Sequence, residues 1–311
     1  MSLAVVFPGQ GSQSVGMLAA LARRYPSVLE TFAEASARTG LDLWRLAQQG
    51  PEEELNITTH TQPALLAGGV AVWRCWQERG GAPPAYLAGH SLGEYTALVC
   101  AGALSFSDAA ALVAERAHLM QEAVPAGAGA MTAILGLPEE RIEEICRRPG
   151  FRDVVAPANY NAPGQVVLSG QAESVAEAAA AAREVGARRT LRLPVGVPSH
   201  CPLMRPAAAR LARVLEAQSW LPPRIPVLHN VDAGICADPA ALPEALSSQL
   251  YLPVRWTETV QRLVRQGVQR VLEFGPGRVL AGLCRRIDRR LEVLSVEDPD
   301  SLERALEAAG A

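Results

Sequence analysis

A serine between two glycines, at the end of an apolar run, is the strongest sign of chemistry in this sequence. The segment Tyr86–Tyr95 reads YLAGHSLGEY, and Gly89, Ser91 and Gly93 match the G-x-S-x-G pattern of a strand-turn-helix nucleophile elbow. The glycines let the backbone turn sharply, so the hydroxyl is exposed while the following helix directs free N–H groups at a reacting carbonyl. The pattern predicts that Ser91 forms an acyl-enzyme. A serine that only caps the helix would give the same five residues, so further residues must support the chemistry.

A serine nucleophile needs a neighbouring base, and His200 is the strongest candidate. It stands in a proline-flanked loop, Val197–Pro202, with the sequence VPSHCP. Histidine suits this role because its ordinary pKa of ~6.5 lets it take up a proton and return it near neutral pH. His229, which ends a predicted strand, is the main competitor. The other histidines of the chain are His60, His90 and His118.

A glycine-rich loop, Phe7–Gln13 (FPGQGSQ), directly follows the first predicted strand. Its backbone N–H groups should emerge at the same edge of the sheet as Ser91, because ligand-binding loops follow the carboxyl ends of parallel strands. The loop can therefore supply a hydrogen-bond donor to an oxyanion. Phosphate binding is the weaker alternative, since Gly9, Gly11 and Gly16 do not match G-x-G-x-x-G and no G-K-[ST] follows.

Composition limits the class of protein. The 311 residues are 49% hydrophobic and 20% charged, which is typical of a globular chain with one large domain or two smaller ones. We expect a cytoplasmic protein, because no secretion signal and no membrane-spanning apolar run is evident. The six cysteines form no C-x-x-C pair, which argues against a zinc site or a disulfide framework. A net charge of −3 argues against nucleic-acid and membrane partners.

The order of expected elements predicts an α/β fold with two domains. Strands are expected at 3–7, 85–88, 225–229 and 268–274, and helices at 63–78 and 92–100. Between them lies a βαββαβ order, the ferredoxin-like pattern. Its expected strands are 131–135, 153–157, 165–169 and 188–193, and its helices are 138–148 and 172–186. We predict a large catalytic domain (1–125 and 195–311), an inserted small domain (126–194) and a cleft between them.

A series of motifs, in this order along the chain, resembles those of the bacterial malonyl-CoA:acyl-carrier-protein transacylases. They are FPGQGSQ, TQPALL, GHSLGEYTALVCAG, AERAHLMQEAV, the N-x-N-x-P-G-Q run at 159–165, VPSH, QLYLPVRW and EFGPG. The resemblance extends from about residue 4 to about residue 285. It implies an α/β-hydrolase-like large domain with an inserted ferredoxin-like small domain, which agrees with the pattern of elements.

The resemblance implies a role for each matching residue. Ser91 would form a malonyl ester and His200 would be the base. The backbone N–H groups of Gln10 and Leu92 would form the oxyanion hole, where a donor contributes roughly 2.7–4 kcal/mol. A carbonyl at the position of Gln249 would orient the histidine in place of an aspartate.

Arg116 would select the substrate. Malonyl differs from acetyl by a free carboxylate, which a guanidinium can bind through two parallel hydrogen bonds. Gln62 would help to position the same group, although a glutamine that caps a helix starting at Pro63 would look the same in sequence. The chain departs from the family at Gly196, where a serine is expected. The small Ser199 favours malonyl, while acceptance of a bulkier acyl group stays open.

The implied enzyme is a malonyl-CoA:acyl-carrier-protein S-malonyltransferase of fatty-acid biosynthesis. Malonyl would pass from malonyl-CoA to Ser91 and then to the phosphopantetheine thiol of holo acyl carrier protein, in a ping-pong reaction without cofactor or metal. The alternatives are a free-standing acyltransferase of polyketide synthesis or malonate metabolism and, less favoured, a serine hydrolase or thioesterase. A non-catalytic carrier-binding module is disfavoured because serine, histidine and arginine are all present.

Cationic surfaces should attract both partners, because the donor carries phosphates and carrier proteins are typically acidic. Arg188 and Arg189 open the last small-domain strand, and we expect them to contact the carrier protein. A second cluster lies on a carboxy-terminal helix and consists of Arg285, Arg286, Arg289 and Arg290. The alternative interpretation of this cluster is a solvated helix face with no partner. We expect a monomer, since no heptad pattern is evident.

Overall fold

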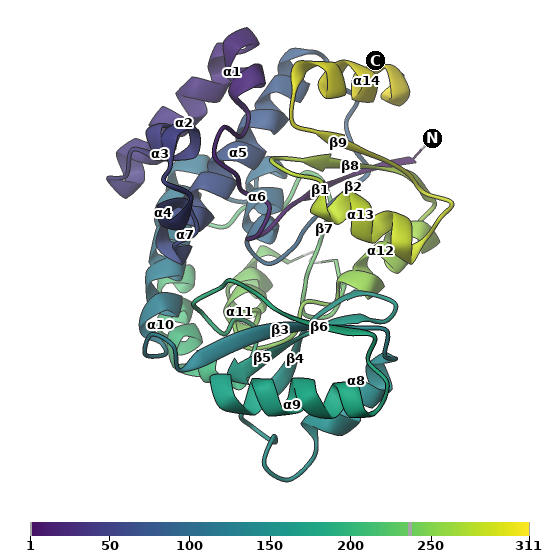
Figure 1. Ribbon diagram of the computed structural model, residues 1–311. Helices are drawn as coiled ribbons and strands as arrows, with labels where there is room; N and C mark the ends of the chain where they lie inside the picture. The colour runs from purple at the N-terminus through teal and green to yellow at the C-terminus, as the bar shows by residue number, and fades with distance from the viewer. Residues whose placement is uncertain (1, 236–237, 311) are drawn as a thin grey trace.

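The structure is a computed structural model that describes residues 2–235 and 238–310. Cys236, one of the six cysteines, lies outside these ranges. Within them, the chain forms one parallel and one antiparallel sheet, each packed against helices (Figure 1). Among the described residues, none of the helices combines the length and apolar character needed to span a membrane.

The elements follow one another along the chain as listed here: β1 (Ser2–Phe7), α1 (Ala19–Arg24), α2 (Pro26–Thr39), α3 (Leu43–Gln49), α4 (Glu52–Leu55), α5 (Thr58–Glu78), β2 (Tyr86–Gly89), α6 (Leu92–Cys100), α7 (Phe106–Glu122), β3 (Gly129–Leu135), α8 (Glu139–Cys146), β4 (Val155–Ala162), β5 (Gln165–Gln171), α9 (Ala172–Glu184), β6 (Arg189–Arg192), η1 (Pro202–Met204), α10 (Arg205–Glu216), β7 (Val227–Leu228), η2 (Pro239–Ala241), α11 (Leu242–Ser248), α12 (Trp256–Arg265), β8 (Val268–Phe274), α13 (Val279–Ile287), β9 (Glu292–Val296) and α14 (Pro299–Ala309).

The parallel sheet has the strand order β7-β2-β1-β8-β9. Its central strand β1 is an apolar run whose alternate residues pack on opposite faces, as expected for a strand with helices on both sides. Val5 and Phe7 pack in the core with α5 and α6, and Ala4 and Val6 pack in the core with α12 and α13. In the register of β1 with β2, Phe7 pairs with Gly89, so the glycine-rich loop and the elbow leave the sheet at the same edge.

The antiparallel sheet has the order β4-β5-β3-β6, and its elements follow the expected βαββαβ sequence. Helices α8 and α9 cover its outer face (Figure 1), where Ile134 and Leu168 belong to a core of their own. Met131 lies on the opposite face of β3. The expected α/β fold with a second, ferredoxin-like sheet is confirmed, while the domain boundaries at 126 and 194 stay a prediction.

Some element boundaries differ from the sequence-based expectation. Helix α5 begins at Thr58 and contains Pro63 rather than starting there. Thr58, Thr61 and Gln62 before the proline are buried, so packing outweighs the hydrogen bond that a proline cannot donate. Strand β4 continues to Ala162 because it pairs with β5 across two irregularities. Strand β7 is short because only Leu87 and Ala88 of β2 pair with it.

Candidate active site

The elbow holds Ser91 in a strained turn between β2 and α6. Its φ of 52° and ψ of −107° are unusual for a residue with a side chain. The Asn230 side chain stabilises this turn on both sides. Its Oδ1 accepts a hydrogen bond of 2.6 Å from the Ser91 N–H, and its Nδ2 donates one of 2.6 Å to the carbonyl of Gly89. The backbone of the elbow is therefore fixed by a residue from a distant part of the chain.

The two elbow glycines are required by close backbone contacts. A Cβ atom on Gly89 would lie 1.9 Å from the carbonyl carbon of Gly93, and a Cβ on Gly93 would lie 2.0 Å from the Phe7 carbonyl oxygen. Both distances are far below any tolerated contact. The glycines of G-x-S-x-G are thus explained by the packing of α6 against β1 and β2.

Ser91, His200 and Gln249 form a hydrogen-bonded chain. The Ser91 Oγ lies 2.8 Å from His200 Nε2, and His200 Nδ1 lies 2.6 Å from the Gln249 carbonyl oxygen. A carbonyl only accepts hydrogen bonds, so Nδ1 carries the imidazole proton and Nε2 accepts from the serine hydroxyl. The structure therefore brings together the three residues that the resemblance implied, with a neutral carbonyl in the place of an acidic residue.

His200 is buried, and this sets its charge. Burial first, and then the positive charge of Arg116, lower its pKa from 6.5 to about 3. The imidazole is neutral at physiological pH, so it can accept a proton from Ser91.

The competing histidines do not contact Ser91. His229 Nδ1 lies 2.6 Å from a carboxylate oxygen of Glu94. His90 lines the pocket, and its Nε2 lies 2.9 Å from Asn161 Oδ1. The prediction of His200 over His229 therefore agrees with the geometry.

Gln10 and Leu92 both line the pocket beside Ser91. Their backbone N–H groups donate to no described residue, whereas the Ser91 N–H is engaged by Asn230. Gln10 approaches the elbow closely because a glycine precedes it: a Cβ on Gly9 would lie 2.5 Å from the His90 carbonyl oxygen. Both N–H groups therefore lie beside Ser91 without a partner among the described residues, and their role as an oxyanion hole stays a prediction.

Arg116 of α7 is 1% exposed, and its guanidinium points to the nucleophile. Nη1 donates to Gln62 Oε1 at 2.6 Å, and Nη2 donates to Gln249 Oε1 at 2.9 Å and to Ser91 Oγ at 3.2 Å. The ring of Tyr95 lies 5.3 Å from the guanidinium carbon. No described carboxylate forms an ion pair with Arg116, and its hydrogen-bond partners are all neutral, while the negative charge of buried Glu94 also acts on it.

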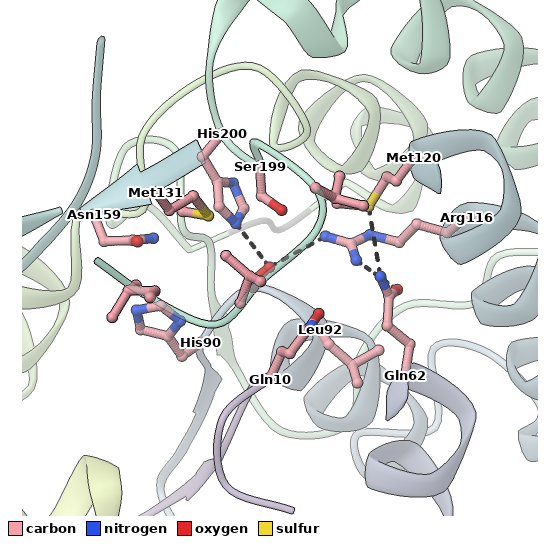
Figure 2. A pocket seen from close by; sticks show the side chains of 14 residues that line it. Gln10, Gln62, His90, Leu92, Arg116, Met120, Met131, Asn159, Ser199 and His200 are labelled. Carbon is pink, nitrogen blue, oxygen red and sulfur yellow. Dashed lines mark hydrogen bonds between the residues drawn. The ribbon is translucent and has the colours of Figure 1, made fainter. Parts of the chain in front are cut away.

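Gln62 is not the cap of a helix. It lies within the first turns of α5, is 1% exposed, and bridges Arg116 and the Met120 sulfur, which lies 3.6 Å from its Nε2. The capping interpretation fails because the helix begins at Thr58. Figure 2 shows Gln62 beside Arg116, on the side of the pocket away from Asn159.

The pocket is lined by residues that follow strands β1 and β2 of the parallel sheet and by residues of the antiparallel sheet (Figure 2). Met131 and Asn159 come from strands of the antiparallel sheet, and Leu193 and Val195 come from the segment that leaves it. Ser199 also lines the pocket. The expected cleft is therefore present.

Gly196 has no contact that would explain the departure from the family pattern. A Cβ added there would meet nothing within 4 Å. A serine would fit at this position, and nothing in the structure explains the glycine.

Two buried residues of the site were not identified from the sequence. Asn230 holds the elbow, and Glu94, inside the GHSLGEY motif, accepts a 2.7 Å hydrogen bond from Gln249 Nε2. Glu94 is the one charged residue of helix α6, and this was the signal in the sequence that could have identified it. Asn230 carried none, because its partners are distant in sequence.

Five of the six cysteines lie in the described ranges. Cys75, Cys100, Cys146, Cys201 and Cys284 are free thiols. No group of three or more histidine, cysteine or acidic side chains in residues 2–235 and 238–310 is placed to hold a metal ion.

Comparisons with known proteins agree with this geometry. A family model described as the acyl transferase domain matches residues 4–290. The malonyl CoA-acyl carrier protein transacylase of Salmonella typhimurium is 54% identical over 303 residues, or 97% of this chain and 98% of that protein.

Solved structures are equally similar. An acyl carrier protein S-malonyltransferase from Vibrio cholerae has a TM-score of 0.95 and 54% identity, and the match covers 98% of this chain and 99% of that one. A malonyl-transacylase solved in complex with its type II polyketide acyl-carrier protein has a TM-score of 0.97 and 55% identity, over 99% and 100% of the two chains. The resemblance seen in the motifs is confirmed, and this chain belongs to the acyl transferase family.

Proposed function

We propose that this enzyme transfers malonyl from malonyl-CoA to the phosphopantetheine thiol of holo acyl carrier protein, in fatty-acid biosynthesis. The relatives named above are malonyl CoA-acyl carrier protein transacylases. The observation that carries the mechanism is that Ser91 Oγ lies within hydrogen-bond distance of both a neutral histidine and a buried arginine.

In the first half-reaction, Ser91 Oγ attacks the thioester carbonyl of malonyl-CoA while His200 Nε2 takes the serine proton. The carbonyl oxygen becomes an oxyanion and accepts hydrogen bonds from the N–H groups of Gln10 and Leu92. When the C–S bond breaks, His200 returns the proton to the departing CoA sulfur. The Gln249 carbonyl keeps Nδ1 protonated throughout, so Nε2 stays available.

The second half-reaction reverses these steps with a new thiol. His200 takes the proton of the phosphopantetheine thiol, and the thiolate attacks the malonyl ester on Ser91. The ester oxygen then leaves and regains its proton from His200. The low pKa of His200 favours this return, because the buried imidazolium is unstable.

Arg116 binds the malonyl carboxylate. In a malonyl ester the free carboxylate is two carbon–carbon bonds from the ester carbonyl, and the guanidinium already lies next to the ester-forming oxygen. Gln62 and Gln249 accept hydrogen bonds from the guanidinium with neutral oxygens, so neither neutralises its charge. An acetyl group offers no carboxylate and leaves the buried cation uncompensated.

The carrier protein docks on Arg188 and Arg189, at the start of β6. Arg189 is exposed at the edge strand of the antiparallel sheet, and Arg188 precedes it. The second cluster is partly used within the fold: Arg285 donates to the Val293 carbonyl, and Arg290 pairs with Asp288. We expect that neutralising Arg188 and Arg189 together slows transfer to the carrier at low salt and leaves Ser91 acylation unchanged. An unchanged transfer rate would exclude this pair.

Intact-protein mass spectrometry tests the function directly. The enzyme is mixed with malonyl-CoA or acetyl-CoA, with and without holo carrier protein. We expect malonyl mass on the wild type, none on Ser91→Ala, and transfer of that mass to the carrier. Free malonate with nothing on the carrier would establish a hydrolase instead and refute the transferase.

A polyketide pathway is the second candidate, because one solved relative was captured with a carrier protein of that class. Rates of transfer to fatty-acid and polyketide carriers, measured side by side, separate the two pathways.

A further inference from the structure

A buried carboxylate lies on the far side of the residues that hold Arg116. Glu94, in the first turn of α6, is 1% exposed and does not line the pocket. Its Oε1 lies 2.6 Å from His229 Nδ1, and its Oε2 accepts hydrogen bonds from Gln249 Nε2 at 2.7 Å and from the Asn230 N–H at 3.2 Å. The proposed chemistry uses none of these contacts directly. Burying a charged carboxylate costs free energy unless it is paired and hydrogen-bonded, so these contacts must stabilise Glu94.

The orientation of the Gln249 side chain is determined by its neighbours. Its Nε2 faces two groups that only accept, Glu94 Oε2 and the Ser91 carbonyl oxygen at 3.0 Å. Its Oε1 faces Arg116 Nη2, which only donates, at 2.9 Å. A rotation of the amide by 180° would set its NH2 against the guanidinium and its oxygen against the carboxylate. Glu94 therefore keeps the Gln249 oxygen directed at Arg116.

The guanidinium depends on this oxygen for its position. Its two side-chain acceptors other than the nucleophile are Gln62 Oε1 and Gln249 Oε1, one on each terminal nitrogen. With only Gln62 left, the guanidinium can rotate away from the plane that presents it to a carboxylate on Ser91.

We propose that Glu94 is a positioning residue for substrate selection, acting through the Gln249 side chain to hold Arg116 in the orientation that binds the malonyl carboxylate. The inference rests on the function proposed above. It assigns no role to Glu94 in the attack itself, because His200 is oriented by the Gln249 main-chain carbonyl and not by its amide.

Two variants separate hydrogen bonding from charge. Glu94→Met has similar volume but no acceptor, so only the Ser91 carbonyl remains to hold the Gln249 NH2 and the amide is held less firmly. Glu94→Gln keeps an oxygen for Gln249 and turns its NH2 toward His229 Nδ1, which accepts in its other tautomer. The measured quantity is the ratio of kcat/KM for CoA release from malonyl-CoA to that from acetyl-CoA. Folding is checked by the melting temperature, and serine reactivity by the rate of labelling with a fluorophosphonate.

We expect Glu94→Met to lower the malonyl-to-acetyl ratio by about tenfold or more, with serine labelling within about threefold of wild type. Glu94→Gln should keep most of the ratio. In an Arg116→Ala background, Glu94→Met should cause no further loss, because the residue through which it acts is gone.

Three results would overturn the proposal: an unchanged ratio in folded Glu94→Met, an equal loss in the Arg116→Ala background, or a loss in Glu94→Gln as large as in Glu94→Met. If Glu94→Met does not fold, Gln249→Met removes the same link and must lower the ratio. A wild-type enzyme without malonyl preference would refute the proposed function. A wild-type preference that is lost in Arg116→Ala but kept in Glu94→Met would refute only the role of Glu94.

Discussion

Replacing Arg116 with alanine should convert a malonyl-selective enzyme into an unselective one. The side chain is 1% exposed and has only neutral partners, so its pairing with a substrate carboxylate takes place out of water. Losing one member of a desolvated charge pair costs about 2–5 kcal/mol, which corresponds to roughly 30-fold to several thousand-fold in kcat/KM. We expect a loss of this size for malonyl-CoA.

Acetyl-CoA provides the internal control. Acetylation of Ser91 should change far less in Arg116→Ala, because acetyl makes no ion pair. Arg116→Lys keeps a positive charge but not the planar fork, so it should give an intermediate malonyl rate. The assay is stopped-flow release of CoA at several substrate concentrations.

Equal losses for malonyl and acetyl would contradict the reasoning. They would show that Arg116 supports Ser91 or the fold, through its contacts with Ser91 Oγ and Gln249, rather than the substrate carboxylate.

Three further predictions concern the histidine, the elbow and a buried acid. Because the pKa of His200 is about 3, kcat/KM for acylation should stay flat from about pH 7 to about pH 5; an acid limb near pH 6.5 would contradict the buried neutral base. Asn230→Ala leaves the Ser91 N–H and the Gly89 carbonyl unpaired, so the rate of Ser91 acylation should fall about tenfold or more. A wild-type rate of CoA release would show that Asn230 is not needed to hold the elbow. Burial raises the pKa of Glu273 from 4.5 to about 7. Between these two pH values the folded protein keeps a proton on Glu273 that the unfolded chain has lost. The stability that this proton provides is therefore lost as the pH rises through about 7. The free energy of unfolding, measured with urea at about pH 5 and about pH 8, should decrease with pH in the wild type. In Glu273→Gln, which stays neutral, this decrease should be smaller by up to about 3 kcal/mol. Equal decreases in both proteins would refute this prediction.

The prediction of the elbow from sequence succeeded because its requirement appears in the residue types of one short segment. Close contact of α6 with β1 and β2 leaves no room for a Cβ at Gly89 or Gly93, and such a need appears directly as glycine in the chain. Strand β8 and helix α6 were predicted with the bounds that they have in the structure, because apolar periodicity and glycine positions mark them.

The predictions that failed concern long-range packing. Pro63 suggested a helix start, yet α5 begins at Thr58, where Thr58, Thr61 and Gln62 are buried in the folded protein. Gln62 is consequently a buried partner of Arg116 and not a cap.

The sequence by itself determined the fold class and the family and predicted Ser91 as the nucleophile, since each of these depends on residue types and motifs that can be found along the chain. Only the tertiary structure decided that His200 and not His229 meets Ser91, because the loop and the strand that carry them are placed by packing between distant segments. It also decided which buried polar groups face one another, as in the contacts of Glu94 with Gln249 and of Asn230 with Ser91. A buried side chain finds its partner through the folded arrangement of its elements, and the order of residues along the chain does not record that arrangement.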